Sequence, residues 1–106
     1  MLYEMRTYSV TVGKMAEALK LYSEEGYPAL EAGGHAVRLG GYMVSDTGPL
    51  HQLVHVWRFK DDAERRAHWK GVYADADFMA FAGKLRPLLA AQEVRLLTNA
   101  PFGPEL

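Results

Sequence analysis

The segment His51–Phe59, HQLVHVWRF, constrains the fold most, because it predicts a β-strand that has no purely polar side. Aromatic and β-branched residues dominate it, and successive side chains of a strand point to opposite faces of the sheet. One set holds Val54 and Val56, and the other holds Leu53 and Trp57. Leaving such side chains in water forgoes about 1.5–3 kcal/mol each. Both faces of the sheet therefore need a cover.

The rest of the chain supplies three more strands and two helical regions. Their composition and apolar spacing predict strands over Leu2–Val10, Ala36–Val44 and Gln92–Leu97, and helices over Lys14–Gly26, over Asp61–Tyr73 and from Asp75. With right-handed crossovers, the simplest arrangement of these elements is an α+β, ferredoxin-like βαββαβ fold. Its antiparallel four-stranded sheet has the order 4-1-3-2, with helices on one face. A length of 106 residues fits one domain over residues 1–106.

Proline, glycine and capping residues mark where these elements end. Pro28 is expected to interrupt the first helical region, and Gly33-Gly34 to stop the short turn that follows it. Asp61 has the character of a helix cap, and Pro87 is expected to end the last helix. Gly40-Gly41 predicts a bulge or a close backbone approach within the second strand.

A second copy of the chain is the predicted cover for the other face of the sheet. The chain is too short for a third layer, and most soluble oligomers are symmetric homo-oligomers. We therefore expect a homodimer formed through the sheets, with Tyr3, Met5, Val54 and Val56 facing the helices. The alternative is a solvated face with a few exposed aromatic side chains. The predicted dimer side carries the opposite set, which is Glu4, Arg6, Tyr8, His55 and Trp57.

That dimer-side set is also the candidate ligand pocket, because apolar surface with a few convergent polar groups is typical of binding sites. The alternative is a purely structural interface, in which Glu4 pairs with Arg6 and the remaining polar groups are hydrogen-bonded. In an enzyme, His55 would act as the general base and Arg6 would stabilise a developing oxyanion, with Tyr8 as the third catalytic candidate.

Several kinds of site are excluded or disfavoured by the residues present. The chain has no cysteine, which removes disulfides, thiol nucleophiles and cysteine-based zinc sites. His51 and His55 would lie about 13 Å apart on one strand, too far to share an ion, so we expect no metal site. Haem ligation by His55 or His68 is a minor alternative, and no cofactor is expected.

Charge and hydropathy bear on partners and location. The formal net charge of -1 gives no electrostatic reason to expect nucleic acid. No apolar run approaches the roughly 20 residues that span a bilayer, so no membrane insertion is expected. The first residues do not have the pattern of a signal peptide, and the lack of cysteine fits a reducing compartment, so we expect a cytoplasmic protein.

Several segments, in this order, resemble the NIPSNAP family. They are Tyr3–Val10 (YEMRTYSV), Gly13-Lys14, Gly48–Gln52 (GPLHQ), Val54–Trp57 (VHVW), Arg86–Leu89 (RPLL), Gln92-Glu93 and Ala100–Phe102 (APF). The family's Asp-Pro-x-Trp stretch appears here as Asp75–Phe78 (DADF), so its tryptophan has no counterpart. The likeness covers nearly the whole chain.

The resemblance implies a ferredoxin-like subunit of the dimeric α/β-barrel superfamily that dimerises through its sheets. It implies no reaction, because the family has no generally established activity. Related members include cofactor-free monooxygenases and haem-degrading enzymes with a Trp–His–Asn site. That site is not reproduced, because the only asparagine is Asn99, near the tail.

Three classes of function follow from these observations. The leading expectation is a homodimeric domain that binds a small, partly apolar molecule at the sheet face. One alternative is a cofactor-independent monooxygenase or isomerase with His55 as general base. The other is a scaffold that binds another protein.

Overall fold

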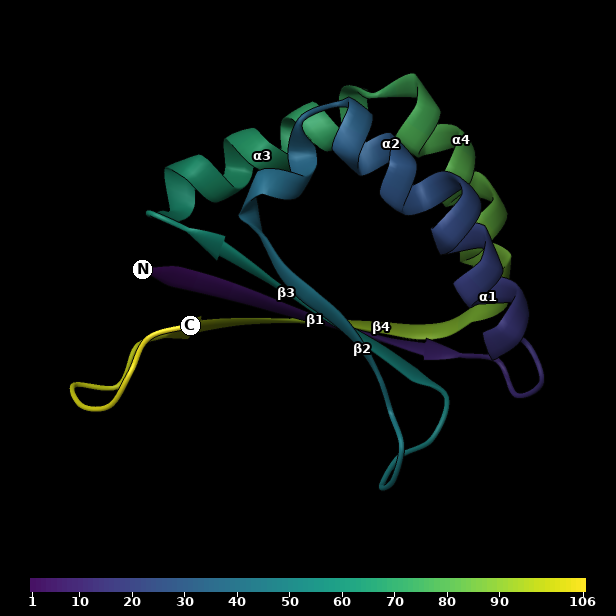
Figure 1. Ribbon diagram of the computed structural model, residues 1–106, viewed down its shortest axis with the longest axis horizontal. Helices are drawn as coiled ribbons and strands as arrows, with labels where there is room; N and C mark the ends of the chain where they lie inside the picture. Colours follow the sequence, from purple (N-terminus) through teal and green to yellow (C-terminus); the bar gives the residue numbers. More distant parts are fainter.

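Strands β1 and β3 form the centre of a four-stranded antiparallel sheet in the computed structural model, which describes residues 1–106 (Figure 1). The strands are β1 (Leu2–Val10), β2 (Leu39–Val44), β3 (Gln52–Phe59) and β4 (Leu89–Thr98). Their spatial order, β2-β3-β1-β4, is the predicted order in reverse direction. This confirms the ferredoxin-like α+β fold.

The helices arch over one face of this sheet (Figure 1). They are α1 (Met15–Leu21), α2 (Tyr27–Ala32), α3 (Asp62–Ala74) and α4 (Ala76–Leu85), with single turns η1 (Tyr22–Gly26), η2 (His35–Arg38) and η3 (Arg86–Leu88). None of these helices is long and apolar enough to cross a membrane. The opposite face of the sheet carries no helix, and we call it the open face.

The predicted break at Pro28 does not occur. The chain continues from α1 through the π-helical turn η1 into α2, and Pro28 lies in the first turn of α2. The π-helical turn lies just before Pro28 and is closed by the hydrogen bond from Tyr27 N–H to Tyr22 O, so the helix changes its hydrogen-bond pattern where the proline supplies no donor. The helical region does end at the predicted glycine pair, where Gly34 adopts a φ of 73°.

Side-chain caps fix both ends of the connection between α3 and α4. The Asp61 carboxylate accepts a hydrogen bond from the Glu64 N–H at 2.9 Å, as the capping pattern predicts. The Asp75 carboxylate accepts from the N–H groups of Asp77 at 3.0 Å and Phe78 at 3.2 Å. Asp75 therefore ends α3 and starts α4 within one residue, which turns the chain sharply above the sheet.

Strand boundaries differ from the prediction at two places. Residues 35–38 form the turn η2, so β2 begins at Leu39 and not at Ala36. Strand β4 begins at Leu89, earlier than the predicted Gln92. The predicted irregularity at Gly40 is confirmed, since the β2–β3 register shifts between Leu39 and Gly41.

Two apolar clusters fill the space between the sheet and the helices. The larger cluster includes the buried side chains of Phe81 and Leu85 from α4 and of Leu88 from η3. The smaller cluster lies beneath α2 and α3 and contains Leu30, Trp57, Phe59 and Val72.

The predicted assignment of sheet faces was wrong. On β3, the buried side chains are Leu53, His55, Trp57 and Phe59, and they face the helices. Val54 and Val56 point to the open face instead. The physical reason is the size of the two sets, since burying one leucine and two large aromatic rings removes more apolar area from water than burying two valines.

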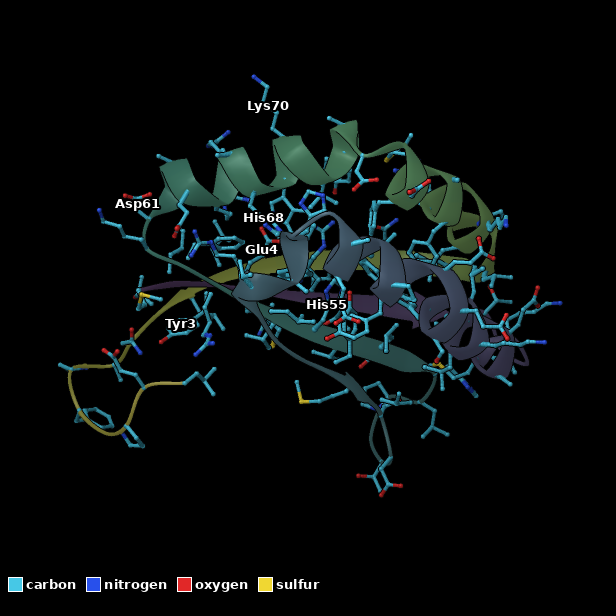
Figure 2. All side chains as sticks on the ribbon, turned by 45° about the horizontal axis from the view of Figure 1, so that its top comes forward. Tyr3, Glu4, His55, Asp61, His68 and Lys70 are labelled. Carbon is cyan, nitrogen blue, oxygen red and sulfur yellow. The ribbon has the colours of Figure 1, made fainter.

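Strand β1 follows the same inversion. Glu4 lies directly opposite Trp57 and Arg6 directly opposite His55, so both face the helices. Tyr3 and Met5, predicted to face the helices, belong to the open face. Figure 2 shows Glu4 on the helix side of β1 and Tyr3 on the other side. The five candidate residues therefore do share one face, as predicted, but it is the covered face within one subunit.

Candidate functional site

A pocket lies between the sheet and the helices, where β1 and β3 pass beneath α3 and α4. Its cavity volume is about 50 Å³, and a water molecule needs about 10–15 Å³ on this measure. Most of its wall is aromatic or aliphatic, and the candidate residues Arg6, Tyr8, His55 and Trp57 all contribute to it. The other lining residues are Tyr22, Leu30, Tyr42, Trp69, Tyr73, Phe78, Phe81, Ala82, Leu85, Arg86, Leu89 and Gln92.

The fifth candidate, Glu4, lies beside this pocket and forms ion pairs with Arg6 and Arg65. Its side chain is fully buried, and its two oxygens accept hydrogen bonds from Arg6 Nη1 at 3.2 Å and Arg65 Nη1 at 2.8 Å. A buried carboxylate needs such partners, because water no longer solvates its charge. Two guanidinium groups thus share one buried carboxylate, and Arg65 also reaches the surface carboxylate of Asp62 at 2.9 Å.

Arg65 does not lie on the solvated face of α3, although the run of charged residues around it in the sequence favours such a face. Its side chain is only 18% exposed, whereas that of its neighbour Arg66 is 74% exposed, as expected. Arg65, Trp69 and Val72 recur at helical spacing and form the inner face of α3. The helical spacing of these three residues is present in the sequence. The arginine pair Arg65-Arg66, however, favours a solvated face at this position.

Arg6 reaches the pocket with its charge only partly neutralised. Its guanidinium carbon lies 4.5 Å from the centre of the Trp69 ring and 5.8 Å from that of Tyr8. Both distances are within the range of cation–π attraction. The aromatic rings therefore hold the Arg6 guanidinium in place, while Glu4 accepts a hydrogen bond from Nη1 of that guanidinium.

His55 is fixed between aromatic rings on the floor of the pocket. The ring of Tyr42 stacks on it at 4.7 Å between centres, and Tyr8 meets it edge-on at 4.9 Å. Trp57 Nε1 donates a hydrogen bond to His55 Nδ1 at 2.7 Å. An indole nitrogen can only donate, so Nδ1 is the acceptor and the neutral ring carries its proton on Nε2. Burial, and then the positive charge of Arg6, lower the pKa of His55 to about 3.

Three donors of the pocket have no hydrogen-bond partner in the protein. They are Arg6 Nε, His55 Nε2 and Trp69 Nε1, and all three atoms are buried. A buried donor without a partner costs about 1–3 kcal/mol. The pocket is therefore rich in donors that are not used to stabilise the fold.

The tyrosine hydroxyls around these donors stay neutral. Burial raises the pKa of Tyr8, Tyr22 and Tyr42, and Arg6 only partly opposes this effect. The only formal charge on the buried wall of the pocket is therefore that of Arg6.

Two histidines outside the pocket occupy structural positions. His35 Nε2 lies 3.0 Å from a carboxylate oxygen of Asp75, which ties η2 to the start of α4. His68 packs among Phe59, Trp57 and Trp69. No group of three or more histidine, aspartate or glutamate side chains is placed to hold a metal ion.

Three aromatic residues that line the pocket were not among the candidates from the sequence. Trp69 and Tyr73 come from α3 and their rings stack at 5.8 Å, while Tyr42 comes from β2. The four-residue spacing of Trp69 and Tyr73 places them on one face of a helix, and this was the available signal. The position of Tyr42 depends on the register shift between Leu39 and Gly41, and the glycine pair predicts an irregularity there without specifying the resulting register.

The chain resembles proteins of known structure over its whole length. The NIPSNAP family model matches residues 3–104. A NIPSNAP domain protein from Burkholderia xenovorans has 37% sequence identity and a TM-score of 0.88, over 99% of this chain and 100% of that one. A NIPSNAP family protein from Agrobacterium tumefaciens has 33% identity and a TM-score of 0.89, over 96% of this chain and 88% of that one. No curated protein matches the sequence.

A more distant likeness confirms the fold alone. A protein from Nitrosomonas europaea described as an antibiotic biosynthesis monooxygenase has a TM-score of 0.67 with 12% identity, over 93% of this chain and 98% of that one. The family match and the close structural relatives agree with the motifs quoted above, from YEMRTYSV to the tail. The chain belongs to the NIPSNAP family.

Proposed function

We propose that this NIPSNAP domain binds a small, partly apolar molecule in the pocket between the sheet and helices α3 and α4. The observation that carries the proposal is the set of buried donors without partners, Arg6 Nε, His55 Nε2 and Trp69 Nε1. Ligand sites are typically apolar pockets in which a few polar groups fix the ligand's orientation. Most buried polar groups of a protein core are paired within the protein, and these three all belong to residues that line one pocket.

Access to the pocket supports the same proposal. Tyr73, Arg86 and Gln92 line it and are exposed, at the end of α3, in η3 and on β4. They form a rim through which a ligand could enter without unfolding a helix. The inner cavity is small, so a ligand would place a compact polar end inside and an apolar body at the rim.

A thermal-shift screen against phenols, quinones and short acyl compounds tests the proposal, because a ligand that binds only the folded state raises the unfolding temperature. Leu89→Trp would fill the pocket from β4. The matched control is Ala90→Trp, because Ala90 is exposed and does not line the pocket. We expect binding to be lost in Leu89→Trp and kept in Ala90→Trp. The proposal fails if no compound binds, or if both variants bind equally.

General-base catalysis by His55 is not the function that the geometry favours. The Nδ1 lone pair already accepts from Trp57, and Nε2 carries the proton. With its pKa lowered to about 3, the ring is also a weak base. His55 is therefore suited to donate a hydrogen bond and not to remove a proton.

A second proposal concerns the open face of the sheet, which we propose is covered by another copy of the chain. Val54 and Val56 of β3 are only partly covered there, and Met43 of β2 is 52% exposed. The open face also carries an apolar hollow that includes Met43, Val56 and Leu106 of the tail. A symmetric partner would bury this surface in both subunits.

Light scattering tests this second proposal. We expect about twice the chain mass of 11.9 kDa at micromolar concentration. Val56→Glu would place a charge in the interface and should give monomers. The control is Lys70→Glu, since Lys70 projects from α3 away from the sheet (Figure 2). A wild-type monomer at high concentration would exclude the dimer.

A further inference from the structure

The three unpartnered atoms of the pocket all offer the same kind of interaction. Guanidinium and indole nitrogens only donate hydrogen bonds, and the Trp57 contact leaves the His55 proton on Nε2. The pocket therefore presents Arg6, His55 and Trp69 as donors, and the neutral hydroxyl of Tyr8 beside Arg6 leaves Arg6 Nε without a partner. A ligand group that satisfies all three must accept hydrogen bonds at more than one lone pair.

The balance of charge adds a second condition. Glu4 is the only buried carboxylate near the pocket, and it faces the guanidinium groups of both Arg6 and Arg65. Arg6 Nη1 donates a hydrogen bond to the Glu4 carboxylate, while Arg6 Nε has no partner. Arg65 is shared between Glu4 and the surface carboxylate of Asp62, so Arg6 is the one cation at the inner end of the pocket. Low polarity there strengthens its attraction for an anion.

Shape supplies a third condition. His55 lies between the rings of Tyr42 and Tyr8, and Arg6 lies over Trp69 at 4.5 Å. A cavity of about 50 Å³ between such flat walls suits a small planar group. A tetrahedral phosphate carries more charge, and the single guanidinium of Arg6 would leave part of it unpaired.

We propose that the pocket recognises the carboxylate of a small aromatic or branched aliphatic acid, bound by hydrogen bonds from Arg6 Nε, His55 Nε2 and Trp69 Nε1. This inference rests on the proposed function, since it names the ligand class of the same pocket. The apolar body of the acid would lie against Phe81 and Leu85 and extend toward the rim at Tyr73.

Benzoate and benzamide are matched probes, because they share a ring and differ in charge and in one acceptor oxygen. Two-dimensional ¹H–¹⁵N NMR would follow the indole N–H of Trp69 and the imidazole N–H of His55 during titration with each probe. We expect benzoate to bind at least about tenfold more tightly than benzamide, a difference of about 1.4 kcal/mol. The two donor protons should shift most.

Variants of the donors test the assignment. Arg6→Met should abolish the preference for benzoate while benzamide binding remains, and Trp69→Phe should weaken benzoate several-fold. Arg66→Met is the matched control, since that arginine is exposed and does not line the pocket, and it should leave both affinities unchanged. If Arg6→Met fails to fold, Trp69→Phe decides alone, because Trp69 is only partly buried.

The outcomes separate this inference from the proposed function. Equal binding of the two probes, or a preference for benzoate that survives in both Arg6→Met and Trp69→Phe, overturns the carboxylate. Competition by inorganic phosphate at equal strength also overturns it, in favour of an unspecific anion site. If neither probe binds but another compound of the screen occupies the pocket, the carboxylate is excluded while the pocket stands. If nothing binds at all, the proposed function fails.

Discussion

Trp57 and His55 share a buried hydrogen bond in which the indole Nε1 donates to the imidazole Nδ1 at 2.7 Å. The two residues are neighbours on one face of β3, so the strand itself sets their separation. The bond fixes the neutral tautomer of His55, whose remaining proton lies on the unpartnered Nε2. In this way a residue that is part of the core, Trp57, determines what a residue of the pocket can do.

Trp57→Phe should allow His55 to populate both neutral tautomers. The ring of phenylalanine keeps most of the packing but has no N–H, so Nδ1 loses its donor. We expect the ¹⁵N shifts of His55 to change from those of a single Nε2–H tautomer to those of a mixture. A spectrum of the wild-type protein that shows an Nδ1–H tautomer would contradict the assigned geometry.

Stability should fall as the medium is made mildly acidic. The pKa of His55 is lowered from 6.5 to about 3 by burial and then Arg6, and that of His68 to about 4 by burial, His35 and Arg38. Between these values and 6.5 the unfolded chain binds protons that the folded chain does not. The free energy of unfolding is therefore greatest above 6.5 and decreases toward lower pH, by up to about 1.4 kcal/mol per unit for each group.

Urea unfolding between about pH 7 and about pH 5 measures this slope. His55→Gln removes one of the two titrating groups and should reduce the slope by about half in that range. Stability that is constant with pH in the wild-type protein would contradict the burial of both neutral rings.

Topology was predictable here because it depends on features that recur along the chain. Alternation in His51–Phe59, helical spacing around Phe81 and the cap at Asp61 are local signals, and each was confirmed. The convergence of Glu4, Arg6 and His55 also followed, because strand periodicity and antiparallel order place them on one face. Their use as a ligand site is a proposal and not a finding.

The side of the sheet on which these residues lie was not predicted correctly. Polar types such as Glu4 and Arg6 suggested an interface or solvent. In the structure Glu4 is paired with Arg65 of α3, and Arg6 packs on the ring of Trp69 of the same helix. Arg65 lies 61 positions from Glu4 in the sequence and meets it only after α3 has packed on the sheet. Local sequence patterns do not reveal such long-range pairs. The prediction therefore did not place the Glu4 carboxylate between the sheet and the helices, where Arg65 stabilises it.

The pairing of Glu4 with Arg65 predicts a sharp contrast between two adjacent arginines. Arg65→Met removes one of the two cations on a fully buried carboxylate and should destabilise the fold by about 1.5–3 kcal/mol. Arg66→Met removes only a surface contact to Asp62 and should change the free energy of unfolding little. Chemical denaturation of both variants gives the comparison, and equal losses would show that Glu4 does not depend on Arg65.

Gly26 packs directly against the ring of Phe81, where η1 meets α4. Its φ of -67° suits any residue, so backbone conformation does not require glycine there. Space does, because an added Cβ would lie 2.5 Å from Cζ of Phe81. Gly26→Ala should therefore destabilise the protein by about 1–3 kcal/mol through overpacking.

Gly83→Ala is the matched control for Gly26→Ala, because a Cβ on Gly83 meets nothing within 4 Å. That variant should be more stable than the wild-type protein by about 0.5–1 kcal/mol, as expected for alanine in a helix. In a Phe81→Leu background the steric conflict disappears, so Gly26→Ala should then cost much less, with a coupling of about 0.5–3 kcal/mol in a double-mutant cycle. Additive effects of the two substitutions would mean that the ring of Phe81 does not pack against Gly26.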